Sequence, residues 1–463
     1  MKNLRDILKK ETWRVEAATA GSLCVAYPGG YREAVSSLGY HFALGCGGGL
    51  GARRAQRTFA PGAEAMMRSS RLCPPLRMIE SERSVASSRA VFISVAYELQ
   101  LGHVVDILER SGLEALRRRR KRQDPAVFIG GACTMSNPAL LAPVADAVVA
   151  GDGEGIIGDI AAAIDDGRSR EDIVEELKSR PSVIAGEHNL DSFEFGCAPA
   201  GAPPVCSLFV SPVSVFKNMF LVELMRGCPH GCAFCIMASG RSRAKPVYVP
   251  AEKVLACIPD WAARVGLVGA SVLDHPEIDL ILEELGRRSV ELGLSSMRAA
   301  RLSEKRAAML AAAKMTTATV ALDSPSERIR LRIKKPAKRK HVVAAAANAK
   351  KAGIRKLRLY ALVGFEGEEE HDYTELADTC RELGSILPTT VSLGPVVPKR
   401  FTPLREAPFM DRRAYRSAVM FIRKRVKGSA AIKAESYRTA LREYELSRLD
   451  YGGAHDLVVK RGF

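Results

Sequence analysis

The sequence lacks any apolar run long enough to cross a membrane, and its first residues lack the apolar stretch of a signal peptide. Both absences predict a cytoplasmic protein with no membrane partner. The 11 cysteines among 463 residues are odd in number and irregularly spaced, which excludes a disulfide framework. Cytoplasmic thiols stay reduced, so these cysteines are expected to be free or to bind a metal.

Acidic residues are too few to balance the basic ones: 52 Asp and Glu stand against 69 Lys and Arg, a formal net charge of +17. Much of the excess lies in two runs, residues 117–122 and 332–341. A basic patch can hold nucleic acid through phosphate contacts, but these runs lack interleaved aromatic residues. The favoured interpretation is therefore solvated helix ends or loops, with nucleic acid as a partner that the sequence allows but does not favour.

Three cysteines lie within eight positions of the stretch LMRGCPHGCAFC, at Cys228, Cys232 and Cys235. A structural zinc site needs four ligands, and no second pair of cysteines or histidines has zinc-like spacing. A 4Fe-4S cluster held by three thiolates instead leaves one iron open to a substrate or cofactor. The glycines and the proline around the cysteines allow a tight turn and make a poor hydrophobic core. The spacing therefore predicts that these three cysteines bind an iron–sulfur cluster.

The stretch VELMRGCPHGCAFC resembles the cluster motif of the radical S-adenosylmethionine (SAM) superfamily, in particular the branch that carries a cobalamin-binding domain and is related to methylthiotransferases. This resemblance implies a 4Fe-4S cluster and S-adenosylmethionine as cofactors, and an electron donor such as flavodoxin or ferredoxin. It also implies reductive cleavage of S-adenosylmethionine to a 5′-deoxyadenosyl radical that acts on an unidentified substrate. The protein would then supply binding, orientation and exclusion of water.

Strands and helices alternate after the cysteines, which predicts an α/β fold with a parallel sheet. Too few repeats are visible for a closed eight-fold barrel, so a partial (β/α)6 barrel is expected, with its site at the strand carboxyl ends. The resemblance assigns six residues to cofactor binding: Gly266, Gly269, Ser296, Arg298, Asp323 and Gly364. The first two would lie beside the methionine amino group, the next two would face the ribose and carboxylate, and the last would lie against the adenine. Asp323 stands where relatives often carry Glu, and no catalytic side chain is predicted.

Before the cysteines, four strand–helix units predict a doubly wound, Rossmann-like sheet with a ligand site beyond its strand carboxyl ends. Six glycines are expected at those ends: Gly29, Gly30, Gly130, Gly131, Gly151 and Gly153. No G-x-G-x-x-G opens the first helix, so a dinucleotide site is not supported. By resemblance this domain is cobalamin-binding-like, yet it lacks the Asp-x-His-x-x-Gly segment that supplies an axial histidine in many cobalamin proteins. Two alternatives stay open: cobalamin bound without a protein histidine, or an empty, degenerate domain.

The expected organisation is a cobalamin-binding-like domain over residues 1–178, a linker over 179–215, a radical SAM barrel over 216–410 and a helical extension over 411–463. Two functions from different classes follow. The first is a radical SAM enzyme, with cobalamin-dependent methyl transfer as one form of its reaction. The alternative is an RNA-binding or RNA-modifying iron–sulfur protein whose cluster only senses or stabilises. The missing fourth protein ligand favours the enzyme, because a purely structural site gains from full ligation.

Overall fold

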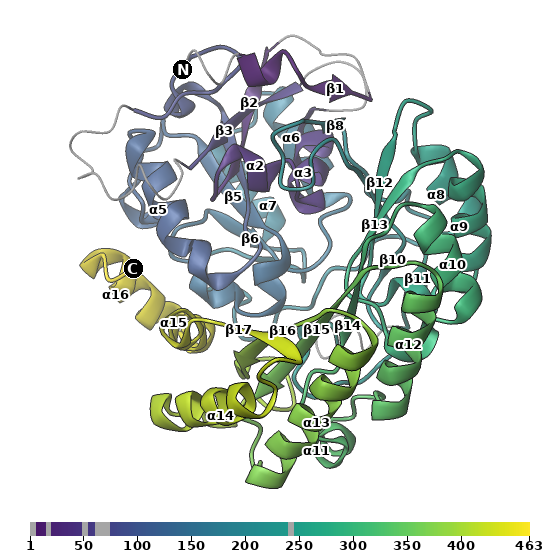
Figure 1. Ribbon diagram of the computed structural model, residues 1–463. Coiled ribbons are helices and arrows are strands. Elements are labelled where there is room, and N and C mark those ends of the chain that lie inside the picture. Colours follow the sequence, from purple (N-terminus) through teal and green to yellow (C-terminus); the bar gives the residue numbers. More distant parts are fainter. Residues whose placement is uncertain (1–5, 15–19, 49–53, 61–74, 239–244) are drawn as a thin grey trace. The chain divides into compact units, whose positions relative to one another are not determined.

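The computed structural model of the chain describes residues 6–14, 20–48, 54–60, 75–238 and 245–463. They form two compact α/β units, which Figure 1 colours by position along the chain. The first unit consists of Met1–Asn218 together with Leu446–Phe463, and the second of Met219–Glu445. Among the described helices, none is both long and apolar enough to span a bilayer.

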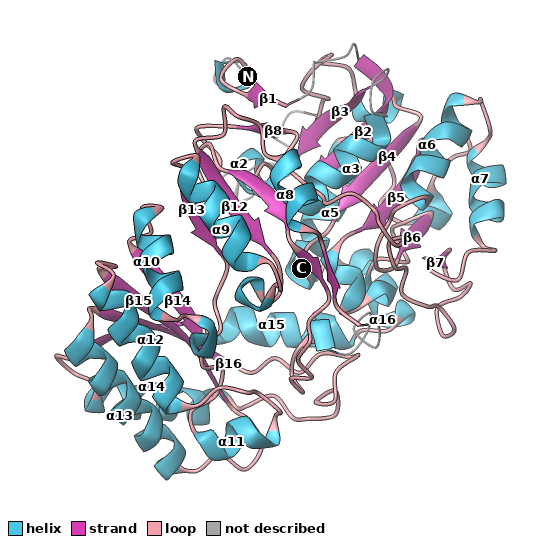
Figure 2. Ribbon diagram, turned by 90° about the vertical axis from the view of Figure 1, so that its right-hand side faces the viewer, coloured by secondary structure: helices cyan, strands magenta, loops and turns pink. Residues whose placement is uncertain are grey.

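The first unit is built on a six-stranded sheet in the order β3-β2-β4-β5-β6-β7 (Figure 2). Its strands are β2 (Ala20–Tyr27), β3 (Arg54–Phe59), β4 (Ala90–Ser94), β5 (Ala126–Gly130), β6 (Ala147–Val149) and β7 (Val183–Ile184). All neighbours pair in parallel except β6 and β7, which pair antiparallel at one edge. Because β3 lies on one side of β2 and β4 on the other, the strand order reverses between β2 and β4. The sheet is therefore doubly wound, with its topological switch point at that position.

Helices cover both faces of this sheet because side chains alternate along its strands. Leu23 and Val25 of β2 pack in one core with α3 (Leu38–Gly48), α6 (Ile156–Asp165) and α7 (Arg170–Leu177). Cys24 and Ala26 face the opposite core, which includes α5 (Leu101–Arg110) and the carboxyl-terminal helix α16 (Tyr451–Lys460). The last residues of the chain thus form part of the core of the first unit.

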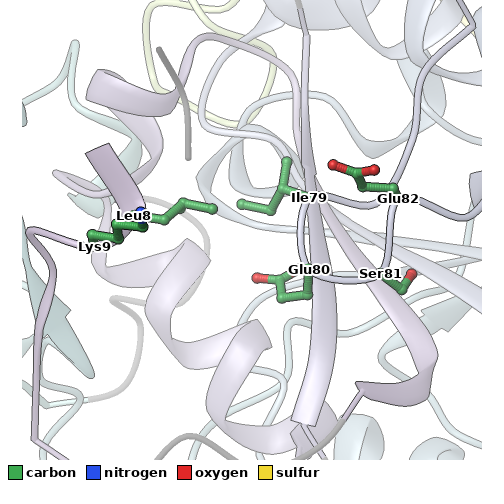
Figure 3. Close-up of a pocket in the computed structure, with 6 residues that line it drawn as sticks. All are labelled: Leu8, Lys9, Ile79, Glu80, Ser81 and Glu82. Atoms are coloured by element: carbon green, nitrogen blue, oxygen red, sulfur yellow. The ribbon is translucent and has the colours of Figure 1, made fainter. Parts of the chain in front are cut away.

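A buried arginine ties the amino-terminal segment to the first unit. The Arg57 guanidinium donates to both carboxylate oxygens of Glu11, at 2.8 and 3.0 Å, and also pairs with Glu80. It lies 5.1 Å from the ring of Trp13 in β1 (Thr12–Trp13) and 4.8 Å from the ring of Phe209 in β8 (Phe209–Val210), two strands that pair antiparallel. These partners offset the penalty of burying the charge. The surface depression of about 470 Å³ beside Glu80 is lined by Leu8, Lys9 and residues 79–82, so no predicted site residue contributes to it (Figure 3).

The second unit contains parallel strands that follow one another in chain order. They are β9 (Phe220–Glu223), β12 (Arg264–Val268), β13 (Glu291–Leu294), β14 (Thr317–Ala321), β15 (Lys356–Val363), β16 (Thr389–Pro395) and β17 (Ala430–Ala434). Hydrogen bonds join β9, β12 and β13 in one sheet and β14 to β17 in another, and a parallel bridge between Met297 and Val320 links the two. The crossover connections place every strand carboxyl end at the same edge.

The helices between these strands are α8 (Ala251–Cys257), α9 (Ile278–Arg287), α10 (Glu304–Ala312), α11 (Glu327–Arg332), α12 (Arg339–Lys351), α13 (Glu370–Ile386) and α14 (Arg412–Arg425). Figure 1 shows α9, α10, α12 and α13 along one face of the strands. The alternation predicted from the sequence is therefore present, and the unit is a partial β/α barrel in which α9, α10, α12 and α13 each bury apolar residues.

Two segments differ from the expected organisation. The predicted helical extension over 411–463 contains strand β17, which pairs in parallel with β16. The sequence of β17, Ala-Ala-Ile-Lys-Ala, is rich in helix-forming alanine, and none of its residues is fully buried, so its strand pattern is weak. The predicted linker over 179–215 contributes β7 to the sheet of the first unit and β8 to the pair with β1. Short strands of two residues leave too little periodicity to be recognised in a sequence.

Candidate functional site

The three clustered cysteines lie in a loop that follows the carboxyl end of β9. The loop, here called the cysteine loop, spans residues 227–246, of which 239–244 lie outside the described part of the chain. Its ends are held together by the antiparallel pair of β10 (Met225–Arg226) and β11 (Val247–Tyr248). Gly227 opens the loop with φ at +73°, a conformation that glycine adopts without strain.

The cysteine thiols lie close enough to influence one another electrostatically. The pKa of the Cys232 thiol is raised to about 11, mainly by burial; Lys335 lowers it, and Cys235, Asp323 and Cys228 contribute to the rise. Burial likewise raises the pKa of the Cys235 thiol; a hydrogen bond from the Met237 backbone and the charge of Lys335 lower it, whereas Cys228 and Asp323 raise it. Within the described residues, no three His, Cys, Asp or Glu side chains converge at metal-ligand distances. The structure therefore groups the predicted ligands in one loop beside a lysine without bringing three sulfur atoms to one point.

The middle of the cysteine loop is anchored by residues that lie far from it in the sequence, at the end of α11 and after β15. The backbone N–H of Ala233 donates to the carbonyl of Ile333 at 2.9 Å. The Phe234 ring meets the Phe365 ring edge-on at 6.0 Å between centroids. Ala233, Ile333 and Phe365 belong to a small hydrophobic cluster with Val396. This anchoring fixes the segment between the second and third cysteines.

The two glycines predicted beside the methionine amino group have different positions. Gly266 lies within β12, where a Cβ atom would be 2.5 Å from Leu221 Cδ2 and 2.9 Å from Met219 Sδ. Glycine at this position therefore allows Leu221 and Met219 to pack against β12. Gly269 follows the carboxyl end of β12, and its carbonyl accepts a hydrogen bond from the Ser295 hydroxyl at 3.2 Å. Only Gly269 lies at the edge where a cofactor is expected.

Arg298, which was predicted to face the cofactor, bonds a carboxylate of the protein through its Nη1 atom. Its Nη1 donates to both oxygens of Asp274 at 2.8 Å, and Arg301 Nε donates to the same carboxylate. His230 Nε2 lies 2.9 Å from Asp274 Oδ2, and the Ser271 hydroxyl donates to that oxygen. Burial alone would raise the pKa of the Asp274 carboxyl, but these hydrogen bonds hold it well below its usual range. Ser296 lies half-buried two residues before Arg298.

Asp323 follows the carboxyl end of β14 and forms an ion pair with Lys335. Its φ of +62° is uncommon for a residue with a side chain, and its backbone N–H donates to the Tyr360 carbonyl at 3.1 Å. The pair is mostly buried, with 15% of the Asp323 side chain and 13% of the Lys335 side chain exposed. Lys335 belongs to the second basic run, which the sequence placed in solvent, and that expectation was wrong for this residue.

Gly364 follows the carboxyl end of β15 with φ at +98°, and a Cβ atom there would lie 2.9 Å from Met410 Cβ. Its N–H and that of Phe365 donate to the Glu368 carboxylate at 2.8 and 3.0 Å. Burial raises the pKa of Glu368 to about 7, although these backbone bonds and one from Tyr373 oppose the rise. The loop is therefore shaped around a buried carboxyl group.

Sequence reasoning missed the acidic and cationic groups that organise this edge. Asp274, Glu368 and His230 were given no role, and Lys335 was considered only as a member of the second basic run. Asp274 lies a few residues beyond the buried strand β12, which is the position where functional side chains of parallel sheets gather. That position was the available signal for Asp274. Nothing in the sequence alone marks which cations it binds.

The glycines at the strand carboxyl ends of the first unit contact the protein itself. A Cβ atom at Gly131 would lie 2.4 Å from the Val95 carbonyl oxygen, and one at Gly29 would lie 2.9 Å from Cε1 of Tyr27. The chain after β4, at the switch point, is tied down internally because Gln100 Oε1 accepts from the Ala96 N–H at 2.6 Å. A side chain at either glycine would therefore meet atoms of the protein itself.

Comparisons with known proteins bear on both units. Residues 222–380 match the family model of the radical SAM superfamily, and residues 52–185 match the model of the N-terminal region of radical SAM proteins. An uncharacterized protein of Methanocaldococcus jannaschii is 26% identical over 339 residues, which is 70% of each chain.

Among solved structures, the fold is similar to that of the cobalamin-dependent S-adenosylmethionine radical enzyme OxsB with aqua-cobalamin bound. That similarity has a TM-score of 0.51 and 10% identity, and it covers 87% of this chain and 56% of the other. Streptococcus suis SuiB bound to S-adenosylmethionine matches 49% of this chain and 52% of its own, with 15% identity and a TM-score of 0.35. This chain thus spans about half the length of these two solved structures.

Proposed function

The chain is an enzyme of the radical SAM superfamily, and from this premise we propose that Cys228, Cys232 and Cys235 bind a 4Fe-4S cluster used to cleave S-adenosylmethionine. The observation that carries the proposal is the grouping of three thiols in one loop at the carboxyl ends of parallel strands. When bound, such a cluster would supply the electron that cleaves the sulfonium to methionine and a 5′-deoxyadenosyl radical, and a donor such as flavodoxin or ferredoxin would replace that electron.

The residues of the chain hold, orient and shield the reacting groups. Lys335 favours the thiolate forms of Cys232 and Cys235, which are the forms that ligate iron. The hydrophobic cluster around Phe234 and Phe365 keeps water from one side of the cysteine loop. Ser296, Gly269 and Gly364 follow three strand ends at the same edge and are our candidates for contacts to S-adenosylmethionine.

Iron analysis tests the ligand set. We expect protein reconstituted without oxygen to bind about four irons per chain, the content of one cubane cluster. Replacing Cys228, Cys232 or Cys235 by Ala should abolish iron binding. Cys257→Ala is the matched control, because Cys257 lies outside the loop, at the end of α8, and should leave the iron content unchanged. Full iron content in a variant with all three cysteines replaced by Ala would disprove the assignment.

Cobalamin-dependent methyl transfer is the second candidate, supported by the doubly wound sheet of the first unit and by its likeness in fold to a cobalamin enzyme. We favour a reaction without cobalamin for two reasons. The sequence has no Asp-x-His-x-x-Gly segment, and the glycines at the switch-point edge contact the protein's own atoms. Protein mixed with hydroxocobalamin and desalted should then retain no cobalt by elemental analysis. Stoichiometric cobalt with a shifted visible spectrum would instead favour the methyl-transfer reaction.

A further inference from the structure

We infer that Asp274 is a positioning residue that fixes the amino-terminal half of the cysteine loop through His230. We call the bonds that join Asp274 to His230, Arg298 and Arg301 the Asp274 clamp. The importance of this clamp for an iron–sulfur cluster rests on the proposed function, whereas the clamp itself is a property of the folded chain. In the described part of the chain Asp274 bonds His230, Ser271, Arg298 and Arg301 and no thiol, so its influence on the cysteines passes through the histidine that lies between the first two of them.

Three loops from three strand ends meet at this carboxylate. His230 comes from the cysteine loop after β9, Asp274 from the turn after β12, and Arg298 with Arg301 from the segment after β13. The Asp274 side chain is 4% exposed. A carboxylate so deeply buried must be fully bonded, and it is, because each oxygen accepts from at least two groups.

The two halves of the cysteine loop are held in different ways. The second half has the Ala233 backbone bond and the Phe234 ring contact. In the first half, a Cβ atom at Gly231 would meet no atom within 4 Å, so packing around that residue is open. The His230 side chain, 21% exposed, provides a polar anchor for this half. Loss of the anchor should therefore loosen Cys228 and Cys232 more than Cys235.

The same geometry changes the role of Arg298. Its Nη1 donates to both oxygens of Asp274, a charge-assisted contact that holds this end of the guanidinium at the carboxylate. Arg298 thus acts through Asp274 as part of the clamp, rather than as a free guanidinium turned to the carboxylate of the cofactor. His230 lies between two predicted metal ligands in the sequence, and in this network it links the cysteine loop to Asp274.

Hydrogen–deuterium exchange on the cluster-free protein tests the clamp without any assumption about the reaction. In His230→Ala and Asp274→Asn, we expect peptide amides over residues 227–232 to exchange at least five-fold faster than in the wild type. The double variant should exchange no faster than Asp274→Asn alone, because both changes break one link. Asp279→Asn is the matched control: it removes an ion pair with Arg306 on neighbouring elements without touching the loop. Unchanged exchange in His230→Ala would overturn the inference, even if Asp274→Asn failed to fold.

A spectroscopic measurement then separates positioning of the cluster from mere support of the fold. After anaerobic reconstitution, His230→Ala should show an altered electron paramagnetic resonance signal of the reduced protein and a weakened response to added S-adenosylmethionine. His230→Gln, whose amide can still donate to Asp274, should restore the wild-type signal. Faster exchange with an unaltered signal in His230→Ala would overturn the positioning role. If the wild type itself bound no iron, the proposed function would fail while the exchange result still decided the clamp.

Discussion

A buried histidine in the first unit connects helix α3 to the segment before β8. His41 Nδ1 accepts from the Leu208 N–H at 3.1 Å, so its Nε2 carries the proton and donates to the Val35 carbonyl at 3.0 Å. Burial lowers the pKa of His41 to about 4, although the bond to Val35 opposes this. Both ring nitrogens are therefore matched to a neutral imidazole, and protonation must break the contact with Leu208.

This histidine should make the first unit sensitive to mild acid. Because its pKa is lower in the folded chain than in the unfolded chain, its contribution is complete above about pH 6.5 and is lost as the pH falls towards 4. At pH 5 we expect a loss of about 2 kcal/mol in the free energy of unfolding. Urea unfolding at pH 7.5 and at pH 5.0 measures this loss. His41→Gln should reduce the difference in free energy of unfolding between the two pH values. The exposed His188→Gln should keep the wild-type difference, and equal narrowing in both variants would contradict the assignment.

The Asp323–Lys335 ion pair should reveal itself by non-additive stability effects. Removing one partner leaves the other charge mostly buried and unpaired, so Asp323→Asn or Lys335→Met should each lower the free energy of unfolding of the cluster-free protein by about 3 kcal/mol. The double variant should recover much of that loss. A double-mutant cycle by urea unfolding gives the coupling. Strictly additive effects would show that the pair contributes nothing to the fold.

At the scale of elements, the turn before β17 depends on a glycine in helix α13. A Cβ atom at Gly384 would lie 2.0 Å from the carbonyl oxygen of Ser429, just before the strand begins. Gly384→Ala should therefore lower the free energy of unfolding by about 1–3 kcal/mol through overpacking. Gly286 in helix α9 is the matched control, because a Cβ atom there meets nothing within 4 Å.

Gly286→Ala should instead stabilise the protein by about 0.5–1 kcal/mol, since alanine favours the helix. Thermal unfolding of the two variants side by side measures the contrast. Equal effects of the two substitutions would mean that β17 does not pack against α13 in this way.

Strands with strong patterns could be predicted from the sequence, whereas contacts between loops could not. Strand β15 alternates buried and more exposed residues over eight positions, and the cysteine spacing marked its loop directly. Strand β17 has only five residues and no fully buried one. The Asp274 clamp joins residues 44 and 24 positions away, at His230 and Arg298, and no local pattern encodes such a distance. The prediction for Lys335 was wrong because a run of basic residues does not show which of them forms an ion pair with a buried carboxylate.

At the scale of the whole molecule, the excess positive charge should not give tight binding of nucleic acid. The Arg120 side chain is fully buried beside Asp146, and Lys335 pairs with Asp323, so each basic run loses a member to the protein interior. We expect weak binding of transfer RNA at physiological salt in a filter assay, with no change on charge reversal of the exposed Lys334 and Lys338. Submicromolar affinity that falls steeply with salt, with a slope of roughly −0.7 per phosphate contact, would revive the RNA-binding alternative.

The most direct test of the central claim is the release of 5′-deoxyadenosine from S-adenosylmethionine by the reduced protein, measured by liquid chromatography. Given dithionite, the reconstituted wild type should release the nucleoside slowly even without its substrate, because the open iron rather than the substrate would bind the cofactor. Cys257→Ala should match the wild type, and Cys232→Ala should fall to the background of the assay. A wild-type protein with a complete, reduced cluster and no 5′-deoxyadenosine would contradict the account and leave its cysteine loop with a structural or sensing role.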